Sequence, residues 1–132
     1  MEKTLEQYTE VIEACRHIFL KKTADYGTSW RVYRPISVAD QIYIKAYRIR
    51  NIQELKTQKI GDDIENEFRG IVNYAIIGLI QLDLNSEEAE QLETSHVEKL
   101  YNEKAKLAQQ LMQDKNHDYG EAWRMMSQES FA

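Results

Sequence analysis

The residues best suited to chemistry form a short pattern near position 25. It reads K-x-x-D-Y-G-x-x-W-R, from Lys22 to Arg31. These two cations could contact phosphates. The rings of Tyr26 and Trp30 could stack on a base, and Asp25 could orient a bound cation. Such a cluster would clamp a phosphorylated base.

The same pattern also fits a purely structural interpretation. Gly27 would close a helix, Trp30 would fold back onto the core, and Asp25 would bond to the backbone of the turn. Duplication of the pattern does not decide between the two, because structural units duplicate as well.

The D-Y-G-x-x-W-R string occurs twice, starting at Asp25 and again at Asp118, an offset of 93 residues. With this offset Tyr8 corresponds to Tyr101. We therefore expect two copies of one helix–loop unit, the first within 1–84 and a truncated second one, with a linker helix, within 85–132. The second copy stops at Ala132, so we expect either a longer natural chain or cover from another subunit.

A second group of charged residues has the spacing D-x-x-x-x-K-x-x-R, formed by Asp40, Lys45 and Arg48. At about 100° per residue, Lys45 falls at the centre of the apolar face of its helix. It could extend to the edge of the bundle or enter a polar pocket. Asp40 could cap the helix or project toward a ligand.

Acidic residues open the next segment, where Asp62, Glu65 and Asn73 share one helical face and Glu67 lies nearby. Oxygen ligands of this kind suit Mg²⁺ bridging to phosphates. Acids at a helix N-terminus also simply favour the macrodipole. Asn73 interrupts an apolar run, so its amide should be buried and bonded to the protein or to a ligand.

The composition of the chain argues against several classes of protein. The chain has 132 residues, 42% of them hydrophobic, and a net charge of −5, which argues against a protein that coats duplex DNA. The single cysteine, Cys15, excludes an internal disulfide, and no apolar run is long enough to span a bilayer. We expect a cytoplasmic location and no membrane or duplex nucleic-acid partner.

Five glycines and one proline leave few breaks, which favours long helices. Apolar periodicity predicts helices at about 5–22, 37–55, 62–82 and 86–115, the last with a break near Thr94. Capping boxes are expected at Thr4 and Ser95, and an N-cap at Ser37. No segment shows strand alternation, so we predict an all-α bundle of four to five helices.

Three motifs, in this order, resemble the nucleotide modification associated domain family of bacteria and phages. They are K-x-x-D-Y-G-x-x-W from Lys22, D-x-x-x-x-K-x-x-R from Asp40, and E-F-x-G-I-V-N-Y from Glu67. The resemblance extends from about Tyr8 to Leu84. This family is in turn similar to the MazG-like all-α nucleoside triphosphate pyrophosphatases, helical bundles that are usually dimers and use Mg²⁺ held by helix carboxylates.

The resemblance implies a role for each matching residue. Lys45 and Glu67 would be catalytic. Mg²⁺ would be held by Asp40, Asp62, Glu65 and Glu67. The substrate would be held by Lys22, Asp25, Tyr26, Trp30, Arg48 and Asn73.

One position departs from the MazG-like pattern, because Gly70 stands where an E-x-x-D motif starting at Glu67 would place its Asp. Two functions are therefore expected as alternatives for a homodimeric, nucleotide-binding domain. One is a Mg²⁺-dependent nucleoside triphosphate pyrophosphohydrolase, linked to nucleotide modification or pool cleansing. The other is a non-catalytic module that binds a nucleotide or a protein. A purely structural helical oligomer is the third interpretation.

Overall fold

A computed structural model of the protein describes residues 2–55, 64–84 and 91–127. They form four α-helices, α1 (Glu2–Tyr26), α2 (Pro35–Leu55), α3 (Ile64–Asp83) and α4 (Thr94–Tyr119). Two short 3-10 helices, η1 (Ser29–Val32) and η2 (Ala122–Met125), follow α1 and α4. These ranges contain no strand, which confirms the predicted all-α fold, and none of their helices could span a bilayer.

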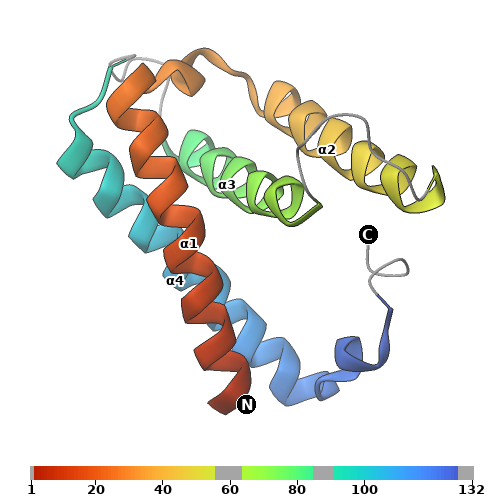
Figure 1. The fold of residues 1–132 in the computed structure, drawn as a ribbon. Coiled ribbons are helices and arrows are strands. Elements are labelled where there is room, and N and C mark those ends of the chain that lie inside the picture. The colour runs from red at the N-terminus through yellow and green to blue at the C-terminus, as the bar shows by residue number, and fades with distance from the viewer. Residues whose placement is uncertain (1, 56–63, 85–90, 128–132) are drawn as a thin grey trace.

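The helices are arranged as two pairs (Figure 1). α1 and α4 run antiparallel, because the Tyr8 hydroxyl near the start of α1 donates to the Ala105 carbonyl oxygen at 2.5 Å, and Arg16 donates to Asn102 on an earlier turn of α4 at 3.0 Å. α2 packs chiefly on α3 and forms one edge of the molecule. α3 also contacts both α1 and α4, so it joins the two pairs.

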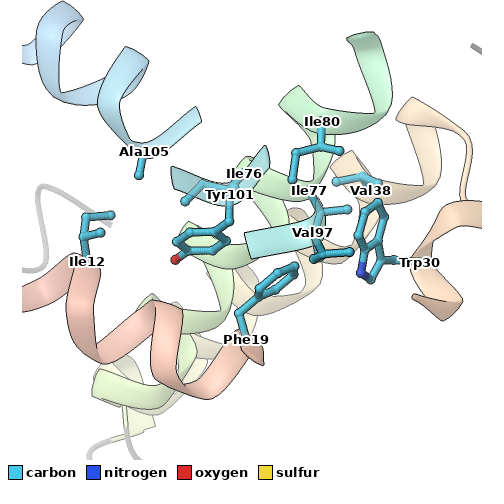
Figure 2. Packing of buried hydrophobic residues seen from close by; sticks show 10 residues of the cluster. All are labelled: Ile12, Phe19, Trp30, Val38, Ile76, Ile77, Ile80, Val97, Tyr101 and Ala105. Carbon is cyan, nitrogen blue, oxygen red and sulfur yellow. The ribbon is translucent and has the colours of Figure 1, made fainter. Parts of the chain in front are cut away.

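The core lies where the apolar faces of all four helices meet. Phe19 is its centre, with ring centroids 4.8 Å from Tyr101 and 6.3 Å from Trp30. Aromatic pairs at these separations add to the stability gained from burial. Figure 2 shows the ten buried members of this cluster: Ile12, Phe19, Trp30, Val38, Ile76, Ile77, Ile80, Val97, Tyr101 and Ala105.

Helix boundaries differ from the sequence predictions at three starts. α1 begins at Glu2, so Thr4 lies inside the helix and its hydroxyl bonds to Glu121 rather than capping. α2 begins at Pro35, whose fixed φ suits a first helical position, and not after Ser37. α4 begins at Thr94, where a break was predicted, and its N-cap Glu93 makes no side-chain cap bond. Residues 91–93 are not helical, and 86–90, the rest of the predicted stretch, lie outside the described residues.

Candidate functional site

Two cations of α2 converge on one buried carboxylate of α3. Arg48 Nη1 donates to Glu67 Oε1 at 2.8 Å, and Lys45 Nζ lies 3.5 Å from Glu67 Oε2. The Glu67 side chain is 3% exposed, whereas those of Lys45 and Arg48 are 23% and 48% exposed. The carboxylate is thus enclosed, and the two cations separate it from solvent. We call Lys45, Arg48 and Glu67 the ion triad.

The position of Lys45 depends on a glycine in the facing helix. A Cβ atom on Gly70 would lie 2.7 Å from Lys45 Cε and 2.8 Å from Lys45 Cδ, closer than real Cβ contacts allow. The lysine side chain therefore crosses α3 where α3 has no side chain. Its ammonium also lies 5.9 Å from the centroid of the Tyr74 ring, within cation–π range. The sequence placed this lysine on the apolar face of α2, and the structure places it in a notch made by Gly70.

The ion triad sets two cations against one carboxylate. A buried carboxylate needs such partners, because leaving it unpaired would cost several kcal/mol. Glu67 Oε2 makes no hydrogen bond within the described part of the chain. Lys45 Nζ, at 3.5 Å, attracts this oxygen by charge alone. The arrangement can hold an anion at the outer side of the cations.

Of the other predicted magnesium ligands, the structure describes Glu65 and Asp40, and neither is shown to contact Glu67. Glu65 is exposed and pairs with Arg69 at 2.6 Å, one helical turn along α3. Asp40 is exposed, and its position five residues before Lys45 puts it about 140° away around α2. Asp62 lies outside the described residues. Among the residues described, no three acidic, histidine or cysteine side chains could hold a metal ion.

Asn73 is buried and bonded to the protein on both sides of its amide. Its Nδ2 donates to the Cys15 carbonyl oxygen at 3.0 Å, and its Oδ1 accepts from the Tyr101 hydroxyl at 2.8 Å. The predicted burial of this amide is confirmed, and the partners are α1 and α4. Burial raises the pKa of both the Tyr101 hydroxyl and the Cys15 thiol above their ordinary values. Asn73 thus cross-links three helices.

The first D-Y-G-x-x-W segment divides between core and surface. α1 ends at Tyr26, Gly27 has φ +67°, and its N–H donates to the Thr23 carbonyl oxygen at 2.8 Å. Trp30 is buried in the core, whereas Tyr26 is 73% exposed. Lys22 and Asp25 are exposed as well. The helix closure and the inward tryptophan are those of the structural interpretation.

The two groups of predicted substrate-binding residues lie at different ends of α3. Gln81 Nε2 donates to the carbonyl oxygens of Trp30, Arg31 and Tyr33, which fixes the η1 loop to the end of α3. Glu67 lies 14 residues earlier, about 21 Å along the helix axis. The η1 loop, which contains Trp30, and the ion triad are therefore not parts of one compact site.

Sequence reasoning missed Gln81 and misread Gly70. Gln81 follows Leu79 and Ile80 in an apolar run, and the argument that predicted the burial of Asn73 could have identified it. Gly70 was taken as a lost metal ligand, whereas in the structure it makes room for Lys45. An open hollow of about 520 Å³ on α4, lined by Ser95, Glu98, Lys99, Asn102, Glu103 and Lys106, contains none of the predicted residues.

Comparison with known protein families supports one assignment. Residues 22–82 match the family described as nucleotide modification associated domain 1. The predicted recognition is confirmed for this segment. The matched segment begins at Lys22 and includes the first D-Y-G-x-x-W segment, the ion triad, Asn73 and Gln81. The second D-Y-G-x-x-W segment and α4 lie outside the matched residues. No curated protein and no solved structure gives a significant match.

Proposed function

We propose that this chain binds a nucleotide, with its phosphates held at the outer side of Lys45 and Arg48. The observation that carries the proposal is the ion triad, in which two cations share one buried carboxylate. Glu67 holds both cations in place before any ligand arrives, which lowers the ordering cost of binding. The side chains of Lys45 and Arg48 are also partly exposed, so their N–H groups can donate to a phosphate from the solvent side.

The family match supports a nucleotide rather than another phosphorylated ligand. The matched residues include all three members of the ion triad. Tyr26 is exposed, and the η1 loop that follows it is bound by Gln81, 14 residues or about 21 Å along α3 from Glu67. We therefore assign phosphate recognition to the ion triad and assign no base contact to Tyr26.

Magnesium-dependent hydrolysis of the MazG-like kind needs carboxylates that converge on one ion. Within the described residues, Glu67 faces cations and Glu65 is paired with Arg69, so this donor set does not fit a magnesium ion. We derive no hydrolytic step from it. The non-catalytic, nucleotide-binding alternative is the one that this geometry favours.

The test is a thermal-shift screen with nucleoside mono- and triphosphates and with inorganic triphosphate, each with Mg²⁺ and with chelator. We expect a shift with triphosphates that persists in chelator and is lost in Lys45→Met. Lys99→Met on α4 is the matched control, because Lys99 is exposed and lies outside the ion triad. An equal shift with inorganic triphosphate would show that the base is not recognised, which would overturn a nucleotide ligand.

Two further outcomes separate the alternatives. No shift with any nucleotide would overturn the proposal and favour a structural bundle. A Mg²⁺-dependent shift accompanied by pyrophosphate release would instead establish the hydrolase. The unfolding free energy of Lys45→Met is measured alongside, because the substitution leaves the buried Glu67 carboxylate with Arg48 alone. A variant that still unfolds cooperatively but shows no shift places the lost contact at the ligand, whereas a loss of several kcal/mol would mean that the missing shift reports lost folding.

A further inference from the structure

α2 has an outward face that no described helix covers. Lys45, Val38 and Ile49 lie on its inner side, toward α3. On the opposite side Tyr43 is 68% exposed and Tyr47 is 56% exposed. Large apolar side chains exposed in a row along one helix are typical of an interaction surface.

The exposed aromatics form an ordered pair. The rings of Tyr43 and Tyr47 stack with centroids 6.2 Å apart and an interplanar angle of 21°. Ile36 extends the row by two turns toward the start of α2 and is 60% exposed. Tyrosine loses little side-chain freedom on binding because it has two χ angles, and a stacked pair has already lost part of that freedom.

Charges flank the tyrosine pair symmetrically. Asp40 precedes Tyr43 by three residues, and Arg50 follows Tyr47 by three residues; both charged side chains are exposed. At about 100° per residue, the four positions lie within about 40° of a common direction. The row therefore reads acid, tyrosine, tyrosine, base, with its centre at position 45.

This order is complementary to itself when reversed. If a second α2 helix lies antiparallel across position 45, Asp40 comes level with Arg50 of the second copy, and Tyr43 comes level with Tyr47 of the second copy. The same four residues are then used on both sides, as a two-fold interface requires. A parallel arrangement would instead place like charges level with one another.

We propose that the outward face of α2 binds a second copy of this chain in an antiparallel α2–α2 contact, with the tyrosines in the centre and two Asp40–Arg50 ion pairs at the rim. The contact lies on the opposite side of α2 from Lys45, so it leaves the ion triad uncovered. It is independent of nucleotide binding, and either proposal can fail without the other.

Charge reversal tests both the surface and the orientation, with sedimentation equilibrium as the measurement. The wild-type chain is expected to dimerise reversibly. Asp40→Arg and Arg50→Asp should each raise the dimer dissociation constant by about tenfold or more, because each places like charges level with one another. The double variant Asp40→Arg/Arg50→Asp should return to within about threefold of wild type.

A mixture of the two single variants makes the test stricter. In an antiparallel contact, an Asp40→Arg chain is complementary to an Arg50→Asp chain, so the mixture should form heterodimers more tightly than either chain pairs with itself. Val11→Ser is a control, because Val11 is 51% exposed on α1, away from this face. A wild-type chain that stays monomeric at 100 µM, or a dimer that neither single reversal weakens, would overturn the proposal.

Discussion

The two D-Y-G-x-x-W segments have nearly the same backbone but different surroundings. Gly27 and Gly120 have φ values of +67° and +70°, and each is followed by a residue near φ −103° and then a 3-10 helix. Trp30 is buried in the core, whereas Trp123 is half-buried and the neighbouring Met125 is 90% exposed. The same local sequence thus sets the turn, and the packing around it sets the burial of the tryptophan.

Each segment is held by a different helix. The first is fixed to α3 by Gln81, and α2 follows it and contributes Val38 to the cluster around Trp30. The second docks on the start of α1, where Arg124 Nη2 donates to Thr4 Oγ1 at 2.6 Å and to Gln7 Oε1 at 2.9 Å. The Thr4 hydroxyl bonded to Glu121 lowers the pKa of that carboxyl. The first contact is mainly apolar and the second mainly polar.

The largest expected difference between the two segments is the stability lost when each tryptophan is replaced by alanine. Trp30→Ala removes a core side chain and should lower the unfolding free energy by about 3–5 kcal/mol. Trp123→Ala should cost about 1 kcal/mol, because the ring is half-buried and little cavity is left. Denaturant titration of the two variants measures both values. Equal losses would contradict the difference in burial.

Replacing the turn glycine by alanine should also cost more stability in the first segment than in the second. Gly27→Ala combines an unfavourable positive φ with a Cβ only 2.5 Å from Gln91 Oε1, so we expect a loss near 3 kcal/mol, the upper end of the range of about 1–3 kcal/mol. A Cβ on Gly120 meets nothing within 4 Å, so Gly120→Ala should cost about 1 kcal/mol, for φ alone. Urea midpoints at constant slope would give the ranking. A larger loss at Gly120 would contradict it.

Tyr8 and Tyr101, which are 93 residues apart, should also differ in what their hydroxyl groups contribute to stability. Tyr101→Phe removes the hydroxyl that donates to Asn73 Oδ1 in the core, and should cost about 2 kcal/mol. Tyr8→Phe removes a bond to the Ala105 carbonyl oxygen, which is part-buried, and should cost about 1 kcal/mol. Thermal unfolding monitored by circular dichroism compares the two, and equal losses would show that burial does not separate them.

The raised pKa of Tyr101 should make the chain less stable at alkaline pH. Burial raises the pKa of Tyr101, so the folded chain keeps a proton that the unfolded chain releases near the ordinary value of 10.0. The unfolding free energy should therefore be unaffected by this group below pH 10 and should fall as the pH rises beyond it. Tyr101→Phe should flatten that part of the pH profile. A profile as steep as that of wild type would exclude Tyr101 as its source.

The smallest expected effect concerns the indole N–H groups. Trp123 Nε1 donates to Asn116 Oδ1 at 3.3 Å, while Trp30 Nε1 has no hydrogen-bond partner in the described part of the chain. Thr23 occupies the position in the first copy that corresponds to Asn116. Asn116→Thr should therefore cost about 1 kcal/mol and remove this difference. A differential scanning calorimetry trace identical to that of wild type would mean that the bond contributes nothing.

Much of the fold could be predicted from the residues alone. The apolar positions Ile12, Cys15 and Phe19 were expected on one face of α1 and are buried there. The amide of Asn73 was expected to be buried because a polar group inside an apolar helix face has no route to solvent. Helix starts were less well predicted, since Thr4 and Ser37 have capping side chains but lie inside their helices.

The residue pattern alone was enough to predict that four segments are helical, which face of the helices is apolar, and that a turn at Gly27 closes the first helix. These properties depend on contacts within about one helical turn, so local residue spacing reports them. Only the tertiary structure decided that Lys45 and Arg48 meet at Glu67, that Gly70 makes room for the lysine, and that Trp30 rather than Trp123 enters the core. Each of these depends on how one helix packs on another, and the spacing of residues within one helix carries no information about that register.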